Sequence, residues 1–323
     1  MEMITHSFPS NAFVQMDLNS ICKDTSPAFA FNKEHLNGEE YAGYLTAVSD
    51  HFKINIQTDT EVQKVHQQDG GWVLTTNQGQ YFANYLIWAA GEFQNPQLGN
   101  ITGSEHCIHS SLIKQPDALE GDDFVIVGGY ESGVQIAFNL IKNNKKVTII
   151  NPYKIDDKST SDPSRVLSPY TYTKYDEIKK SSRYTEILGE VEQVTKQEHQ
   201  LHLKNEAVIE APQKPICATG FALVTGPIEA FITYRKDGTP LLNKETDEFL
   251  GYQNLYLSGP SVRHDNHIFC FIYKFRQRFG VIAEDILRKE GYDERDIAFL
   301  VNRWKTSGMY MADLSCCGDE CVC

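Results

Sequence analysis

A short glycine-containing segment is the part of the sequence best suited to bind a phosphate group. Residues 124–127 form an apolar run that ends at Gly128 and Gly129, and apolar residues at helical spacing follow as far as residue 141. A second apolar run covers residues 147–150. Strand, glycine turn, helix and strand within roughly 30 residues form half of a nucleotide-binding βαβ unit, in which amides at the helix N-terminus bind a pyrophosphate. The alternative is a unit of the same pattern that only packs a sheet.

The glycine segment departs from the common G-x-G-x-x-G pattern at the middle glycine. Gly128 takes the tight-turn position, and Gly133 takes the position where the helix packs closely on the strand. Tyr130 stands where the middle glycine normally lets the phosphates approach the backbone. We predict that the cofactor-binding residues of this turn are Gly128, Gly129, Tyr130, Ser132 and Gly133.

The end of the second strand bears on the choice of nucleotide. An acidic residue commonly accepts a hydrogen bond from the ribose 2′-hydroxyl there, but this sequence has Asn151. Lys154 and Lys158 follow closely enough to contact a 2′-phosphate. We therefore expect NADPH as the cofactor of this unit, with Asn151 and Lys154 beside its ribose, and NADH as the alternative.

Four of the eight cysteines lie close together at the end of the sequence: Cys316, Cys317, Cys321 and Cys323. Thiolates at this spacing can converge on one soft metal or metalloid ion, such as Cu(I), Zn(II), Hg(II) or trivalent arsenic. A redox relay and a reduced tail without chemical role are the alternatives. The remaining cysteines lie in apolar or mixed surroundings, where free cysteine is commonly a small buried side chain: Cys22, Cys107, Cys217 and Cys270.

Length and composition are those of a globular protein with two domains. The chain has 323 residues, of which 41% are hydrophobic and 23% are charged. A net charge of -13 argues against a nucleic-acid partner, which would require clustered basic residues. No apolar run approaches the roughly 18 residues of a membrane span, and the N-terminus does not resemble a signal peptide. A cytoplasmic protein without a membrane partner is expected.

The elements before the glycine segment are expected to be a helix, a small sheet and a buried strand. Asn37 and Glu40 form a capping pattern for a helix. Its predicted inner face comprises Tyr41, Tyr44, Leu45, Val48 and Phe52. A short strand at 53–57, a β-meander over 61–82 and a buried strand at 85–91 follow.

The elements after the second apolar run are predicted to begin with a loop. Residues 153–182 are polar and read as a loop with a short helix, and strands are expected over 185–211. A strand at 254–260 leads into a helix at 267–289, and a final helix covers 293–304. The predicted core stripe of the longer helix comprises Ile268, Ile272, Phe275, Phe279, Ile282 and Ile286.

Two runs in the chain share one plan, which indicates two related domains. The runs 87–93 and 215–221 are each an apolar strand that closes on small residues and a phenylalanine. We predict an α/β fold with two Rossmann-like nucleotide-binding domains and small β-meanders. The predicted segments are a discontinuous first domain at 1–118 and 212–305, an NAD(P)H-binding domain at 119–211 and a cysteine-rich tail at 306–323.

The order of the motifs resembles that of flavoproteins with two dinucleotide-binding domains, and most closely the flavin-containing monooxygenase-like branch of the pyridine nucleotide-disulfide oxidoreductases. The motifs span residues 5–290 and comprise Ser10-Asn11, Asp50-His51-Phe52, Ala89-Ala90-Gly91, residues 108–116 and Gly128-x-x-x-Ser132-Gly133. The resemblance implies that the first domain, at 1–118 and 212–305, is an FAD-type domain that is N-terminally incomplete, and that the domain at 119–211 holds NADPH. It also implies hydride transfer from nicotinamide to flavin and, in monooxygenases, oxygen activation on the flavin.

The resemblance also assigns roles to individual residues. Asn11 matches the family asparagine that contacts flavin and nicotinamide, and it is the residue expected to act in catalysis. Crossings between the domains are expected at four positions: Ala90, Gly91, Thr219 and Gly220.

The flavin is expected beside Gly259 and Pro260. The positive end of the helix at 267–289 would face its pyrimidine edge. Three residues at that end would act as caps or as functional groups: His264, Asp265 and His267.

One expected motif is missing from the first residues. Such flavoproteins open with a strand and a glycine-rich turn that holds the FAD pyrophosphate, and nothing before Ser10 matches this turn. The expectations are a truncated chain, FAD held without the turn, or loss of flavin binding. Apolar edge strands left uncovered would favour self-association, so a homo-oligomer is one expected outcome.

Three functional hypotheses follow. The first is an NAD(P)H-dependent, monooxygenase-like flavoprotein acting on a small-molecule substrate, with a tail that binds metal or metalloid. The second is a reductase that passes electrons to a thiophilic ion through the tail, because Leu-Ser-Cys-Cys at residues 314–317 resembles the tail of mercuric reductases. The third is a non-catalytic nucleotide- or metal-binding remnant.

Overall fold

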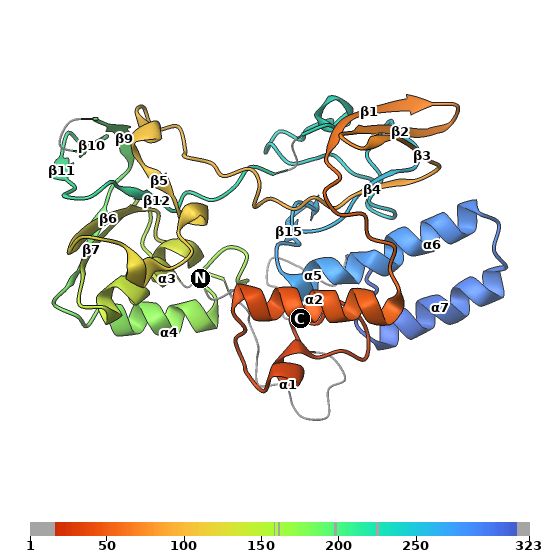
Figure 1. Cartoon of the computed structure of the whole chain (residues 1–323), viewed down its shortest axis with the longest axis horizontal. Coiled ribbons are helices and arrows are strands. Elements are labelled where there is room, and N and C mark those ends of the chain that lie inside the picture. The colour runs from red at the N-terminus through yellow and green to blue at the C-terminus, as the bar shows by residue number, and fades with distance from the viewer. Residues whose placement is uncertain (1–16, 158, 161, 197–198, 224–225, 315–323) are drawn as a thin grey trace. The chain divides into compact units, whose positions relative to one another are not determined.

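The computed structural model describes residues 17–157, 159–160, 162–196, 199–223 and 226–314 (Figure 1). The chain forms two compact units. The central unit is Phe93–Ala222, and the flanking unit combines Glu2–Glu92 with Leu223–Asp319. The segment predicted to bind NAD(P)H, residues 119–211, lies within the central unit.

A five-stranded parallel sheet forms the middle of the central unit. Its order is β5-β12-β6-β7-β8, and every neighbouring pair is parallel. The strands are β5 (Ile108–His109), β6 (Asp123–Val127), β7 (Lys146–Asn151), β8 (Tyr184–Leu188) and β12 (Ile216–Cys217). Parallel neighbours require crossover connections, which α3 (Glu131–Lys142) and α4 (Pro169–Ile178) supply. The order around β6 is that of a doubly wound nucleotide-binding sheet, so the α/β prediction is confirmed.

The parallel sheet is covered on both faces, which explains why its strands read as unbroken apolar runs. Phe124 and Ile126 pack with α3 and α4, whereas Val125 and Val127 pack on the opposite face. That face is covered by the antiparallel strands β9 (Val191–Val194), β10 (Gln200–Leu203) and β11 (Val208–Glu210). In Figure 1, α3 and α4 lie below the parallel sheet and β9–β11 above it. Short 3-10 helices are η1 (Ser104–His106), η2 (Ser110–Leu112) and η3 (Pro116–Ala118).

The two ends of the central unit pair with each other. The amide of Ala222 donates to Asn95 at 2.8 Å, and the amide of Gln97 donates to Gly220 at 3.0 Å. His109 contacts the same backbone at Gly220. Its Nδ1 accepts from the amide of Ser111 at 3.1 Å, so Nε2 carries the proton and donates to the Gly220 carbonyl at 2.9 Å. Burial lowers the pKa of His109, because the charged ring would lose hydration.

The flanking unit contains two small sheets that share one core. The predicted meander comprises β1 (Val62–Gln68), β2 (Gly71–Thr76) and β3 (Gly79–Ala83), and β4 (Leu86–Trp88) pairs in parallel with β13 (Leu255–Leu257). The fully buried indole of Trp72 packs with Leu86 and Leu255 between these sheets. A hairpin of β14 (Arg263–His264) and β15 (His267–Ile268) follows.

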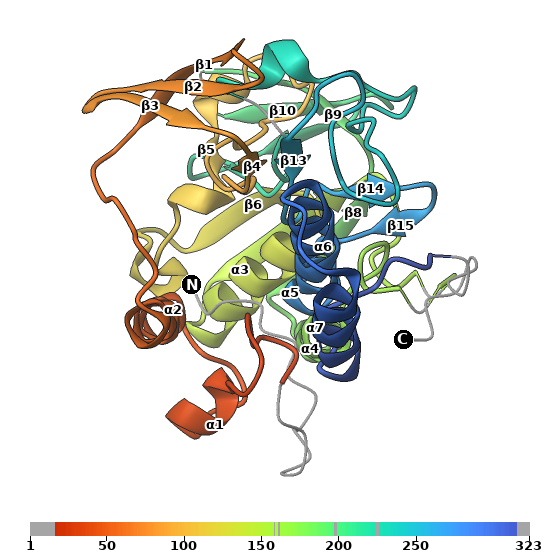
Figure 2. The ribbon, with the colours of Figure 1, turned by 90° about the vertical axis from the view of Figure 1, so that its right-hand side faces the viewer.

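The helices of the flanking unit include two that pack against each other near the C-terminus. They are α1 (Pro27–Phe31), α2 (Gly38–Phe52), α5 (Ile272–Phe275), α6 (Phe279–Lys289) and α7 (Glu294–Thr306), with 3-10 helices η4 (Glu229–Phe231) and η5 (Arg276–Arg278). Figure 2 shows α6 and α7 side by side. The predicted capping box of α2 is confirmed, because Asn37 Oδ1 accepts from the Glu40 amide and the Glu40 carboxylate accepts from the Asn37 amide.

The long helix predicted over 267–289 begins later than expected. His267 and Ile268 are extended in the β14–β15 hairpin, whose turn contains Asp265 with φ of 49°. The chain becomes helical at Ile272 and continues through α5, η5 and α6. Strand pairing therefore overrides the helical spacing of the first residues. Of the predicted core stripe, Ile282 is buried, whereas Phe279 and Ile286 are partly exposed.

Three further expectations for the flanking unit were wrong. Residues 54–57 pair with no described strand, because Lys53 ends α2 in the left-handed conformation. On α2, Leu45 is 37% and Phe52 is 54% exposed, and only Tyr41 and Tyr44 are buried. The strand predicted as buried over 85–91 is limited to β4, where Ile87 is 45% exposed.

A buried charged cluster holds the C-terminal part of the flanking unit. Asp247 and Arg278 are both 0% exposed and form two hydrogen bonds, at 2.9 Å and 2.8 Å. His264 Nε2 lies 2.5 Å from Asp247 Oδ1. The guanidinium also donates to the carbonyls of Met311 at 2.6 Å and Lys244 at 2.8 Å. The cluster thus joins the β14–β15 hairpin, η5 and the segment after α7.

We expect Asp247→Ala to lower the free energy of unfolding by about 3–5 kcal/mol, because it leaves the Arg278 cation buried without its counterion. Urea unfolding followed by circular dichroism measures the change. Asp265→Asn is the matched control, because asparagine tolerates the positive φ of this position and the change removes only the exposed pair with Lys244, which contributes little. Equal losses in the two variants would contradict the assignment.

We expect His109 to make folding stability fall with acidification. The folded pKa of His109 is lowered, so the unfolded chain takes up the proton first, and stability is lost as pH falls below about 6.5 toward the folded pKa. Urea unfolding at pH 7.5 and pH 5 should show a larger decrease for the wild type than for His109→Gln, which does not titrate. A decrease of the same size in both proteins would refute this.

Candidate functional site

The turn between β6 and α3 requires glycine at two positions. A Cβ atom on Gly133 would lie 1.9 Å from the carbonyl oxygen of Gly128. Gly128 itself has φ of 103°. A Cβ atom on Gly128 would lie 2.4 Å from the carbonyl oxygen of Ala218, the residue that follows β12. The start of α3 therefore packs directly on the end of β6, beside the segment that follows β12.

This packing leaves backbone donors at the carboxyl end of β6. Within the residues that the structure describes, the amides of Glu131, Ser132 and Gly133 donate to no protein acceptor, whereas the Val134 amide donates to Tyr130 at 2.9 Å. First-turn amides of a helix carry partial positive charge, and this one begins where the strand order of the sheet reverses. The cradle fits the pyrophosphate of a dinucleotide.

Tyr130 and Asn151 are both held by hydrogen bonds around this turn. The Tyr130 hydroxyl is within hydrogen-bonding distance of the carbonyls of Pro163, at 2.6 Å, and Val166, at 2.8 Å. Asn151 Oδ1 accepts from the Gly129 amide at 2.9 Å, and its Nδ2 donates to the Tyr153 carbonyl. Asn151, at the end of β7, therefore holds the backbone of the turn at Gly129.

Lys154 is exposed after β7, and Lys158 lies outside the described residues. Asn151 stands at the end of β7, and the choice of NADPH over NADH stays a prediction.

Sequence reasoning missed Glu131, which is 7% exposed in the first turn of α3. Its carboxylate accepts from the Ser168 amide at 2.6 Å, from Ser168 Oγ at 3.1 Å and from Thr171 Oγ1. Burial raises the pKa of Glu131, although these donors oppose the shift. One sequence signal could have indicated it. Ser168-Pro169 with Thr171 is a typical helix start, and its hydroxyl groups require a hydrogen-bond acceptor.

The predicted crossing residues divide between the two units. Gly91 has φ of 72° with open space at its Cβ position, and Ala90 beside it is exposed. In the central unit, Thr219 Oγ1 donates to the Gln97 carbonyl, and Gly220 has φ of 82°. Both glycines adopt backbone conformations that other residues rarely take.

The flanking unit has two buried side-chain donors without a protein acceptor among the described residues. Asn19 Nδ2 and Arg276 Nε are buried and have no partner in the described part of the chain. Arg276 Nη1 donates to the carbonyls of Asp17 at 2.7 Å and Ser20 at 2.6 Å, so the guanidinium stands beside the turn that carries Asn19. Buried donors without partners commonly mark a missing ligand or water.

The residues predicted beside the flavin form a turn in which Gly259 is buried and its carbonyl accepts from the Val262 amide at 3.2 Å. Gly259 has φ of 109° and no atom within 4 Å of a Cβ position, and the Pro260 carbonyl accepts from Arg263 Nη1. The start of α5 at Ile272 has no side-chain cap, and the Lys274 and Phe275 amides donate to the Phe271 carbonyl at 2.9 Å.

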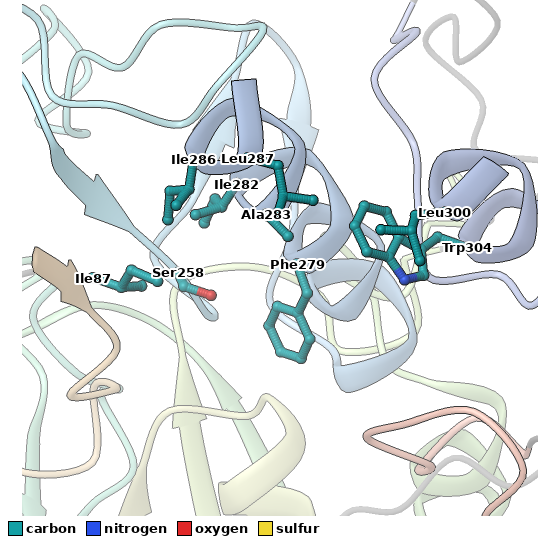
Figure 3. A pocket seen from close by; sticks show the side chains of 9 residues that line it. All are labelled: Ile87, Ser258, Phe279, Ile282, Ala283, Ile286, Leu287, Leu300 and Trp304. Carbon is teal, nitrogen blue, oxygen red and sulfur yellow. The ribbon is translucent and has the colours of Figure 1, made fainter. Parts of the chain in front are cut away.

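An open apolar pocket of about 520 Å³ lies on the flanking unit (Figure 3). Figure 3 shows side chains of α6, α7, β4 and the residue after β13 around it. No predicted site residue lines it, although Ser258 precedes Gly259. Its lining residues are Ile87, Ser258, Phe279, Ile282, Ala283, Ile286, Leu287, Leu300 and Trp304.

Five predicted site residues lie outside the described residues: Asn11, Cys316, Cys317, Cys321 and Cys323. Among the described residues, no group of His, Cys, Asp or Glu is arranged to hold a metal ion, and no helix is long and apolar enough to cross a membrane. Cys107 and Cys217 are buried as expected, whereas Cys22 and Cys270 are partly exposed, and all four are free thiols.

Comparison with known proteins finds relatives that are oxidoreductases. The uncharacterized oxidoreductase CzcO of Bacillus velezensis is 36% identical over 107 residues, which are 32% of this chain and 31% of that protein. Bacilliredoxin reductase Bdr of Bacillus subtilis is 24% identical over 70% of this chain and 68% of its own. A flavin-containing monooxygenase of Arabidopsis thaliana is 28% identical over 44% of this chain and 30% of its own. The match thus spans about a third of the length of CzcO.

Solved structures share the fold. Bacillithiol disulfide reductase Bdr from Staphylococcus aureus matches with a TM-score of 0.67 at 20% identity, covering 80% of this chain and 79% of that one. A flavin-containing monooxygenase from Stenotrophomonas maltophilia matches with a TM-score of 0.60 at 15% identity, covering 79% and 77%. The predicted fold with two dinucleotide-binding domains is confirmed.

The pyridine nucleotide-disulphide oxidoreductase family matches residues 1–259. Its members and the flavin-containing monooxygenases use FAD and NAD(P)H, so FAD and a nicotinamide dinucleotide as cofactors and the flavoprotein resemblance are confirmed. The chain belongs to the pyridine nucleotide-disulphide oxidoreductase family.

Proposed function

We propose that this chain binds NADPH at the glycine turn of the central unit and uses it to reduce a flavin held in part by the flanking unit. The observation that carries the proposal is the row of amides without acceptors at Glu131, Ser132 and Gly133, at the carboxyl end of β6. The pyrophosphate would accept from these amides. In the flanking unit, Arg276 Nε and Asn19 Nδ2 would donate to acceptor atoms of the flavin ring.

The two cofactors would carry the redox chemistry, and the protein would position them. When bound, the nicotinamide supplies hydride and the flavin receives it. The protein would bind and orient the two groups. The positive N-terminal end of α3 would face the pyrophosphate, and the Arg276 guanidinium would stand beside the flavin ring. Asn11 remains our proposed contact between flavin and nicotinamide.

The first candidate for the overall reaction is a monooxygenase-like oxidation of a small nucleophilic substrate. The order of motifs and the similarity to flavin-containing monooxygenases support it. The second candidate is reduction of a disulfide or of a thiophilic ion. It is supported by Bdr, whose match covers 70% of this chain, and by the cysteines at 316, 317, 321 and 323. Those thiols are proposed ligands of a soft metal or metalloid ion.

We expect Ser132→Asp to weaken NADPH binding at least about tenfold, because a carboxylate would compete for the unpaired amides and repel the pyrophosphate. Ser132→Asn is the matched control, since it has the same size without the charge, and it should bind within about threefold of the wild type. Calorimetric titration of the purified protein measures both constants. Equal binding by the two variants, or no binding by the wild type, would exclude the turn as the nucleotide site.

We expect the electron acceptor to separate the two candidate reactions. Protein reconstituted with FAD should oxidise NADPH in either case. Oxygen uptake that rises with an added small nucleophile supports the monooxygenase. Oxidation that continues without oxygen, rises with a disulfide or Hg(II), and is lost in Cys316→Ser/Cys317→Ser supports the reductase. Protein that neither takes up FAD nor oxidises NADPH would disprove both.

A further inference from the structure

The connection between β7 and α4, residues 152–168, is attached to the glycine turn by three consecutive turn residues. Its start is held at Gly129. The Gly129 amide donates to Asn151, whose side chain in turn donates to Tyr153. The buried side chain of Ile155 packs on Gly129 so closely that a Cβ there would lie 2.4 Å from Ile155 Cδ1.

The far end of the same connection is held at Tyr130 and Glu131. The Tyr130 hydroxyl lies 2.6 Å from the Pro163 carbonyl and 2.8 Å from the Val166 carbonyl, and thus spans the backbone on either side of Arg165. The Glu131 carboxylate accepts from the amide and the hydroxyl of Ser168, which begins α4. The Tyr130 hydroxyl therefore contacts the connection in a way that the usual glycine, which has no side chain, could not.

The connection carries cations near both of its attached ends. Lys154 follows β7 by three residues, and Arg165 lies between the two carbonyls that face the Tyr130 hydroxyl; both side chains are exposed. In a sheet of this order, the ribose of a bound dinucleotide lies beyond the end of the second strand, which here is β7. A 2′-phosphate there would require a cation, because Asn151 brings no charge.

We propose that Tyr130 is a positioning residue for the choice between NADPH and NADH, acting by holding Arg165 beside the turn. The inference deepens the proposed nucleotide site and rests on it. Loss of the middle glycine brings a side chain to the phosphate turn, and this side chain fixes the segment that selects the nucleotide. Tyr130 touches the connection, and Arg165 would touch the 2′-phosphate.

The test compares Tyr130→Phe with Tyr153→Phe, whose hydroxyl is on an exposed ring of the same connection. Calorimetric titration gives the dissociation constants for NADPH and NADH. Tyr130→Phe should weaken NADPH binding about tenfold, which matches loss of one positioned hydrogen bond, and NADH binding by less than about threefold. Tyr153→Phe should bind both as the wild type does.

Two further measurements separate positioning from general damage. Arg165→Ala should weaken NADPH selectively, and Tyr130→Phe/Arg165→Ala should be no weaker than Arg165→Ala, because both changes remove one interaction. Without nucleotide, trypsin should cleave Tyr130→Phe faster than Tyr153→Phe after Arg165.

The remaining outcomes overturn the inference. Equal weakening of NADPH and NADH by Tyr130→Phe would mean a merely structural role, and tighter NADPH binding would mean that the phenol obstructs the site. An unchanged preference in Arg165→Ala would remove the cation from the explanation. Wild-type protein that binds NADPH and NADH equally would refute this inference alone, whereas wild-type protein that binds neither would refute the proposed nucleotide site as well.

Discussion

The closeness of Gly133 to the Gly128 carbonyl is the constraint on which the proposed nucleotide site depends. A single added Cβ would lie 1.9 Å from that oxygen, so α3 can begin directly at the end of β6 only with glycine there. This contact places the first-turn amides at the carboxyl edge of the parallel sheet. Two side chains then hold the neighbouring segments: Asn151 accepts from the Gly129 amide, and Glu131 accepts from the amide of Ser168, the N-cap of α4. The positive end of α3 is available to a phosphate because the packing around it is complete.

The flanking unit is organised by charge burial rather than by strand order. Its parallel sheet has two strands, too few to define a nucleotide site by topology. The fixed points are instead Asp247 with Arg278, and Arg276 against the carbonyls of Asp17 and Ser20. Two guanidinium groups two residues apart thus have different roles. Arg278 has its charge matched by a buried carboxylate, whereas Arg276 keeps one buried donor without a partner.

The sequence predicted the β6–α3–β7 unit well because every signal for it is local. Two apolar runs, a helical period and the spacing of Gly128 and Gly133 all lie within one short segment. The β14–β15 hairpin was missed, because it depends on the positive φ of Asp265, while His267 and Ile268 fit a helical period equally well. Glu131 was missed for a different reason. Its partners lie 37 and 40 residues away, and no periodicity links them to it.

The two candidate cofactor sites share one property: each has hydrogen-bond donors without protein acceptors among the described residues. An unpaired buried donor costs roughly 1–3 kcal/mol, so a fold that keeps one must gain elsewhere or must receive a partner. Around the turn, the Tyr130 hydroxyl, the Asn151 amide and the Glu131 carboxylate are all satisfied, and the backbone amides beside them are not. The side chains around the turn are thus paired where they hold its backbone in place. We propose that the open backbone donors beside them receive their acceptors from a bound dinucleotide.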